Sequence, residues 1–376
     1  MNDVNALSRR QFTAIVFISL LPPMIRRFPR VLAERAGNMS WLAGPLAIPA
    51  LALGALLFWL LYRNFGKNTG YDTLLQSLLG PFFGALAVGI YTLWMLFYAG
   101  FLLRSGAMRF VSTIYPDALP GLFLLTMALA CTAAACGSLK ALGRTALLLR
   151  PLLAVLPVAV FVLTLKDADF QLLLPLTGSD PLPLLHCGLE AANLFGVAVI
   201  LSFSAGHIGD GPLRLRDWLG WAGLVLGIVS LITAGCIAMF GPQLTARLRH
   251  PFFMLTRDVT ILGALERVEP LAVAVWVFAD FILISTLLWI SGERLRCVFQ
   301  RLLPPSQEKQ SGFLAFFNRF CCPLLSGAFA AAAAFLLPAE EDVFLRLSDT
   351  VVPLLTAGLS FGFPLLLLVL KMLRKR

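Results

Sequence analysis

Two acidic residues lie within long apolar runs, where their side chains are best placed for chemistry. Glu190 lies between Leu189 and Ala191, and Asp280 lies between Ala279 and Phe281. An ionisable group inside an apolar helix is costly, and it usually transfers protons, binds ions or recognises a charged ligand. We interpret Asp280 as a group that handles a proton or ion, or that binds a ligand ammonium. The alternative for Asp280 is a buried pair with an arginine of another helix.

Glu269 opens the run that holds Asp280 and precedes it by 11 residues. This spacing is about three helical turns, so the two carboxyl groups lie near one face, with Trp276 on the same stripe. For Glu269 we favour a structural role, because it lies near the expected interface. The residues to which we assign structural or gating roles are Arg104, Arg144, Glu266, Arg267, Glu269 and Trp276.

Arginines in or beside the apolar runs usually extend their charged ends to the membrane interface. Arg144 flanks one run, whereas Arg104 lies deepest in another. We therefore expect Arg104 to be the partner of a buried carboxylate.

A pair of prolines, Pro22 and Pro23, interrupts the first apolar run. Prolines within a span free backbone carbonyls, and an unwound backbone of this kind binds substrates in transporters. A simple kink, or an early end of the span, is an equally good interpretation. A second run, around 184–206, is rich in small residues, which permits either close helix packing or unwinding.

The candidate ligand-binding residues come from these two runs: Pro22, Pro23, Met24, Ile25, Glu190, Asn193, Gly196 and Ser202. The candidates for ion or proton coupling are Asp280 and Glu190.

Motifs of enzymes and metal sites are missing from the sequence. It contains no GxSxG, Walker A or HExxH pattern, and its seven Cys include no CxxC spacing. We therefore expect no enzymatic activity, no cofactor and no metal site.

The composition indicates a membrane protein. Hydrophobic residues make up 59% of the 376 residues and charged residues 13%, whereas soluble proteins have roughly 45–50% and about 25%. The net charge of +10 fits basic residues in short loops and at helix ends, so it does not predict nucleic-acid binding. The predicted fold class is an all-α polytopic membrane protein.

Apolar runs of about 20 residues predict ten transmembrane helices. They cover residues 11–30, 42–62, 82–112, 119–137, 145–165, 184–206, 217–241, 268–291, 313–337 and 350–371. The third is long enough to tilt or to extend beyond the bilayer. The segment around 250–257 is expected to be an interfacial helix rather than a span. More Lys and Arg fall inside when both termini are cytoplasmic, so we predict that orientation.

Four segments resemble the B subunit of spore nutrient-germinant receptors, the endospore permeases of the amino acid–polyamine–organocation superfamily. They are Ala36–Ala43 after the proline-bearing first span, Ser138–Arg144 after the fourth, Gly188–Glu190 in the sixth, and Arg257 with Glu266–Leu271 and Trp276 before and in the eighth. The sequence departs from the family pattern at two places. It has Lys140 where the family often has Glu, and it has Pro22-Pro23 where the family usually has a glycine-rich break.

The resemblance implies two inverted five-helix repeats, about 11–165 and 184–371, in one transmembrane domain. It places a small ligand mid-membrane between broken helices one and six. It also implies the inner membrane of the spore, and two partners: a larger A-type membrane subunit and a C-type lipoprotein subunit.

Three functions fit the sequence. The first is a germinant receptor subunit that binds a small nutrient, for which an amino acid is the leading choice, and triggers germination. The second is a proton-coupled secondary transporter of amino acids, with Asp280 or Glu190 carrying the proton. The third is a structural subunit whose pocket no longer binds.

Overall fold

The computed structural model describes residues 6–63, 65, 69–113, 117–174, 181–211, 214–258, 269–302, 312–338 and 340–373. The first half of the chain forms α1 (Arg9–Ala36), α2 (Ala43–Tyr62), α3 (Tyr71–Leu79), α4 (Pro81–Thr113), α5 (Pro120–Ala135) and α6 (Leu139–Thr164). The second half forms α7 (Pro181–Leu194), α8 (Gly196–Leu201), α9 (Leu215–Arg247), α10 (Pro251–Asp258), α11 (Glu269–Leu302), α12 (Gly312–Leu336), α13 (Glu341–Arg346), α14 (Val352–Ala357) and α15 (Phe363–Leu373). Tighter 3₁₀ turns form η1 (Gly37–Leu42), η2 (Phe170–Leu173) and η3 (Ser202–His207), and wider π turns form η4 (Leu347–Val351) and η5 (Gly358–Gly362).

The all-α membrane class is confirmed, and each of the ten predicted ranges is mainly helical. Seven helical stretches of the described residues are long and apolar enough to span a membrane, and the first of these combines α1 with α2. Pro120–Ala135 and Phe320–Leu336 are apolar but shorter, so the count of ten separate spans stays a prediction. With 33 residues, α4 rises about 50 Å, which exceeds the roughly 30 Å of a bilayer's hydrocarbon core.

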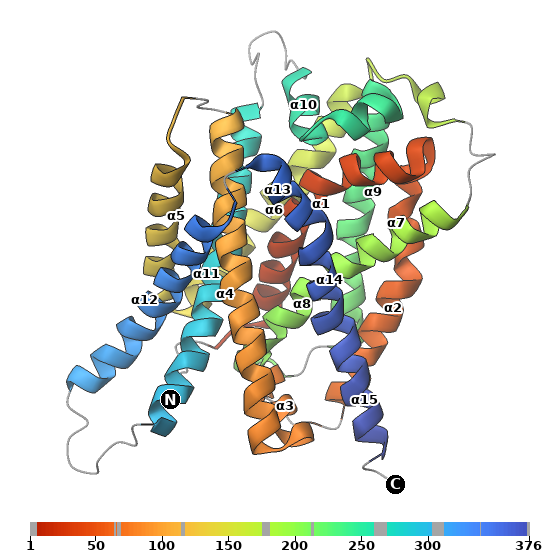
Figure 1. The fold of residues 1–376 in the computed structure, drawn as a ribbon. Coiled ribbons are helices and arrows are strands. Elements are labelled where there is room, and N and C mark those ends of the chain that lie inside the picture. The colour runs from red at the N-terminus through yellow and green to blue at the C-terminus, as the bar shows by residue number, and fades with distance from the viewer. Residues whose placement is uncertain are drawn as a thin grey trace.

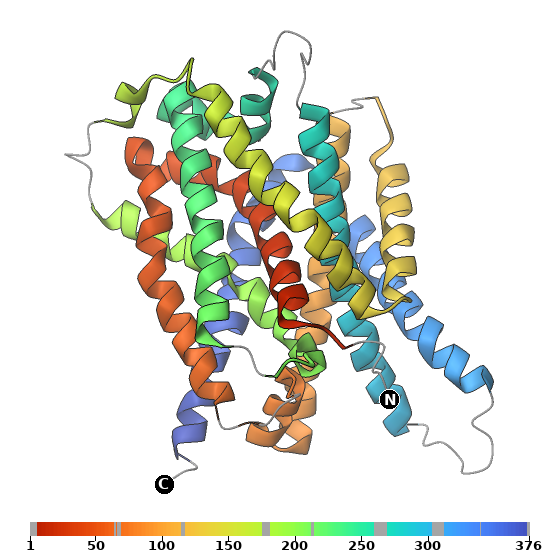
Figure 2. The ribbon, with the colours of Figure 1, turned by 180° about the vertical axis from the view of Figure 1, so that it is seen from behind.

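Helix α1 is continuous, so the prediction of a broken first helix is wrong. Its 28 residues stay helical through Pro22, Pro23 and Pro29, and Figures 1 and 2 show that the helix turns sharply along its length. A proline's fixed φ fits a helix, whereas its missing N–H and its clash with the preceding turn bend the helix. The prolines of α1 therefore kink the helix rather than unwind it.

The predicted break in the sixth span is confirmed. Phe195 separates α7 from α8, and the chain then tightens into η3. Figure 1 shows α7 running obliquely toward the middle of the bundle, where α8 begins. The break therefore lies inside the bundle, among α1, α2 and α14.

Two features of the later chain refine the predicted helix positions. The last span is a helical run in which η4 and η5 insert wider turns between α13, α14 and α15, which the sequence did not predict. Single π turns within helices are frequent at functional sites. The predicted helix around 250–257 is present as α10, and its Phe252, Phe253 and Leu255 are buried.

The core is centred on α1, which packs against α6, α7, α9 and α11 and is buried along most of its length. Figures 1 and 2 show this helix enclosed by the others, with the start of α1 and the end of α15 toward the same end of the bundle. A central helix of this kind brings its own polar residues into contact with several other elements at once.

Candidate functional site

Asp280 of α11 is held by two arginines of the first half of the chain. Arg109 of α4 forms an ion pair with its Oδ2 atom, and Nη1 of Arg26 lies 3.4 Å from the same oxygen. The side chains of Arg109 and Asp280 are only 2% and 4% exposed. The buried pair with an arginine of another helix, which was the alternative interpretation, is therefore the one that the structure contains.

The expected partner of a buried carboxylate, Arg104, does not contact Asp280. Arg104 is half-buried, and among the described residues its Nε atom has no hydrogen-bond partner. Arg109 lies five residues further on, more than one helical turn, and it is this side chain that reaches α11. Arg144 is exposed at the start of α6 and reaches none of these groups.

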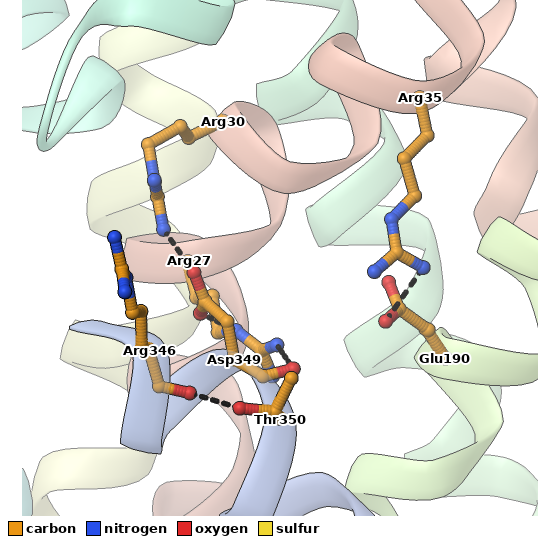
Figure 3. Close-up of polar contacts among 7 residues, drawn as sticks. All are labelled: Arg27, Arg30, Arg35, Glu190, Arg346, Asp349 and Thr350. Atoms are coloured by element: carbon orange, nitrogen blue, oxygen red, sulfur yellow. Dashed lines mark hydrogen bonds and ion pairs between the residues drawn. The ribbon is translucent and has the colours of Figure 1, made fainter. Parts of the chain in front are cut away.

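Two further arginines of α1 share a second carboxylate, that of Asp349 in η4. Nε of Arg27 lies 3.0 Å from Oδ1, and Nη2 of Arg30 lies 2.8 Å from Oδ2 (Figure 3). With Arg26, these residues place three guanidinium groups just beyond Pro22 and Pro23 of α1, facing two carboxylates of the second half of the chain. Sequence reasoning missed Asp349, because only the π turns fix the face of the last span on which it lies.

Glu190 lies on α7, and its Oε1 atom is 2.8 Å from Nη1 of Arg35 (Figure 3). One turn later, Nδ2 of Asn193 donates a hydrogen bond of 2.7 Å to the carbonyl of Pro353 in α14. These two candidate ligand-binding residues therefore lie at the contact of α7 with α1 and the last span.

Gly196 and Ser202 lie on the far side of the break. Ser360 of η5 donates a hydrogen bond of 3.0 Å to the carbonyl of Gly196. A Cβ atom at Gly196 would lie 2.5 Å from Oγ of Ser360 and 2.6 Å from Cγ2 of Thr356, so only glycine allows this approach. The hydroxyl of Ser202, at the start of η3, is buried and donates to the carbonyl of Val199 in the preceding α8.

The other candidates on α1, Pro22, Pro23, Met24 and Ile25, belong to the buried core. A cavity of about 40 Å³ adjoins the break and is lined by residues that include Phe195, Ala198 and Val199. Ordinary ligand pockets measure roughly 300–1,000 Å³. The lining of this cavity comes from α2, the break, α8, α9 and η5, and none of it from α1. On the α1 side, Pro22–Ile25 are buried, so the structure is closed there too.

A smaller cavity of about 10 Å³ lies against Arg109 and Asp280. Such a volume holds about one water molecule. The ion pair is thus nearly dry, and each of its charges depends on the other residues of the cluster.

The aromatic cluster Tyr71, Tyr91 and Phe203 fills the end of the bundle at which α3 lies. The ring of Phe203 is 5.2 Å from that of Tyr71 and 5.3 Å from that of Tyr91. Beside it, Arg294 of α11 pairs with Asp72 of α3. These residues come from α3, α4, η3 and α11 and share no motif, so no pattern in the sequence predicts them.

The residues just before and at the start of α1 are hydrogen-bonded to the end of the sixth span. The N–H of Leu7 donates a hydrogen bond of 2.8 Å to the carbonyl of His207, and the N–H of Gly209 donates one of 2.9 Å to the carbonyl of Leu7. The N–H of Arg9 also donates to Oδ2 of Asp210. This segment therefore covers the same end of the bundle as the aromatic cluster.

The remaining candidates lie around the start of α11. Trp276 is fully buried, with its ring 5.0 Å from that of Phe252. Glu266 and Arg267 lie outside the described residues, as does the side chain of Glu269, whose backbone begins α11. Their predicted structural or gating roles stay predictions.

Solved structures similar in fold include membrane symporters and related proteins. A substrate-bound, outward-open Na⁺-coupled sialic acid symporter matches with a TM-score of 0.61 and 16% identity, over 95% of this chain and 78% of that chain. MhsT in complex with L-phenylalanine gives a TM-score of 0.52 and 16% identity over 98% and 99%. A nucleobase-cation-symport-1 family transporter in a closed conformation with bromovinylhydantoin bound gives 0.51 and 13% over 96% and 80%. These likenesses show the fold, and together with the long apolar helices they define this protein as an integral membrane protein.

The family follows from the sequence itself. The chain belongs to the spore germination protein family of permeases, whose sequence model matches residues 6–307. It is also 22% identical over 275 residues to spore germination protein XB of Bacillus anthracis. This alignment covers 72% of this chain and 76% of that protein. The resemblance inferred from the sequence is therefore confirmed.

Proposed function

We propose that this protein is the membrane subunit of a spore nutrient-germinant receptor that binds a small nutrient, an amino acid, and responds by a change of conformation. The family and the transporter fold support a membrane permease linked to germination. The candidate ligand site lies between α1 and the break of the sixth span, at Pro22–Ile25, Glu190, Asn193, Gly196 and Ser202. Since this region is closed in the structure, ligand entry requires another conformation, which the ligand must bind more tightly.

The pairing of Asp280 is the observation that favours a sensor over a proton-coupled transporter. A coupling group must gain and lose a proton during each cycle. Protonation of Asp280 would leave the charges of Arg26 and Arg109 without their shared carboxylate in a nearly dry site. The ion pair therefore supports a structural role for Asp280, and sensing needs no titrating group.

The family also guides the proposal for location and partners. We place the chain in the inner membrane of the spore, with both termini in the cytoplasm. Its partners are a larger A-type membrane subunit and a C-type lipoprotein subunit, which report the bound state.

The test measures ligand binding and transport on the same purified protein. A ligand that binds only the folded state raises stability by about 2.7 kcal/mol at 100 times its dissociation constant. We expect one or more members of a panel of amino acids, sugars and nucleosides to raise the unfolding temperature in detergent. We expect no uptake of that compound into proteoliposomes under a pH gradient. Concentrative, pH-driven uptake would instead establish the transporter.

A further inference from the structure

Helix α7 carries two buried acceptor oxygens that no donor of the described chain reaches. They are Oε2 of Glu190 and Oδ1 of Asn193. More than nine in ten buried polar groups of native proteins have a hydrogen-bond partner, so each exception calls for an explanation, such as a bound molecule. Both oxygens accept and neither donates, so the missing partner must be a donor.

The other polar atom of each side chain fixes its orientation. Oε1 of Glu190 forms an ion pair with Nη1 of Arg35, at a distance of 2.8 Å (Figure 3). Nδ2 of Asn193 donates a hydrogen bond of 2.7 Å to the carbonyl of Pro353. Because that carbonyl can only accept, the amide must present its nitrogen to it, and the oxygen of Asn193 is left as the acceptor without a partner.

The two oxygens belong to residues on one face of the helix. Residues three apart on an α-helix are neighbours, with roughly 5–6 Å between their Cβ atoms. A single small group with at least two N–H bonds can therefore reach both. The break at Phe195 follows directly, so this face adjoins the region where the sixth span is interrupted.

From this arrangement we infer that Glu190 and Asn193 bind the ammonium group of the ligand. A primary ammonium offers three donors and no acceptor, and its charge matches a carboxylate, whereas a hydroxyl offers one donor. The inference rests on the proposed function and assigns one end of its ligand.

The charges also specify the other end of the ligand. Arg35 already balances Glu190, so a ligand that leaves the site neutral must carry a negative group as well. Arg35 is 36% exposed, and its guanidinium has further N–H donors for a carboxylate. The ligand class that fits is a zwitterionic amino acid, with its ammonium on α7 and its carboxylate on Arg35.

The experiment uses the full chain in detergent and measures the dissociation constant from the thermal shift. The probes are the twenty amino acids, with L-lactate as a carboxylate that lacks the ammonium and n-propylamine as an ammonium that lacks the carboxylate. The variants are Glu190→Gln, Glu190→Asp and, as a matched control, Glu34→Gln, which makes the same change on an exposed residue of α1. Loss of a charge-assisted hydrogen bond predicts binding about 10- to 100-fold weaker in Glu190→Gln and unchanged in Glu34→Gln.

The outcomes separate the inference from the proposed function. Weaker amino acid binding in Glu190→Gln, with an intermediate affinity in Glu190→Asp, supports both the ammonium site and the proposed function. This holds provided that the unliganded variants unfold cooperatively. Unchanged amino acid binding in these variants leaves the proposed function standing and overturns the ammonium site. Binding of n-propylamine alone, lost in Glu190→Gln, supports the site and refutes the amino acid. Binding of L-lactate as tight as that of the amino acids, or no binding of amino acids and amines to the unaltered chain, overturns the inference.

Discussion

Asp280→Asn should be strongly destabilising, although it changes a single atom of the side chain. The substitution removes a carboxylate that is 4% exposed and leaves Arg109 and Arg26, which are 2% and 10% exposed, without their shared counter-charge. Removing one partner of a buried ion pair costs about 3–5 kcal/mol, because the remaining charge stays buried. This loss is a large fraction of the roughly 5–15 kcal/mol that stabilises a typical protein.

Asp349→Asn is the matched control, since Asp349 also faces two arginines but is 29% exposed. Water and salt screen such a pair, and its loss should cost only about 0–1 kcal/mol. The assay is cooperative unfolding of each variant in detergent, by heat and by denaturant. The drop in stability should be several-fold larger for Asp280→Asn than for Asp349→Asn.

A double substitution isolates the interaction itself. Arg109→Gln removes one of the two charges that share Asp280, so Asp280→Asn combined with Arg109→Gln should be less destabilising than the sum of the single changes. Interacting pairs deviate from additivity by about 0.5–3 kcal/mol. Equal losses for Asp280→Asn and Asp349→Asn, together with additive effects in the double variant, would refute the reasoning from burial.

Three further predictions concern other parts of the fold. Gly196→Ala should cost about 1–3 kcal/mol in the unfolding free energy, because its Cβ atom meets Ser360, whereas Gly223→Ala, where nothing lies within 4 Å, should cost little. His250 has a pKa lowered to about 3 by burial and then by the charge of Arg109. Its neutral form is therefore favoured by folding, so the unfolding temperature should fall as the pH drops below about 6.5, and less steeply in His250→Gln. Arg144→Gln, at an exposed position, should change stability by no more than about 0.5 kcal/mol in the same assay.

The sequence predicts the helices well, because hydrophobic runs report directly on burial in lipid. For the sixth span, the small residues alone permit close packing or unwinding, and it is the family resemblance that implies the break now seen at Phe195. It does not predict whether Pro22 and Pro23 break or bend α1, since proline's φ suits both outcomes and the packing around the helix decides. The surrounding helices bury the whole proline region, and the chain there stays helical.

The partner of a buried charge is harder to predict than a helix. It depends on which face of its helix a side chain occupies, rather than on how deep the side chain lies in the apolar run. Arg104 lies deeper in its apolar run than Arg109, yet only Arg109 faces Asp280. Asp349 depends further on two π turns, which shift the faces of the last span and leave no mark in the hydrophobic pattern. The candidate acids were thus found from their cost in lipid, whereas their partners required the fold.

The kinked half of α1 links the candidate site to the rest of the bundle. After Pro22 and Pro23, its arginines contact three separate elements: Arg26 meets α11, Arg27 and Arg30 meet η4, and Arg35 meets Glu190 of α7. A ligand can change the conformation only through contacts that differ between two states. In the proposed site Glu190 would meet this condition, because a ligand at Oε2 would compete with Arg35 for the same carboxylate charge. Binding at α7 would thereby alter what holds the end of α1, and the kink would transmit that change to the buried cluster at Asp280.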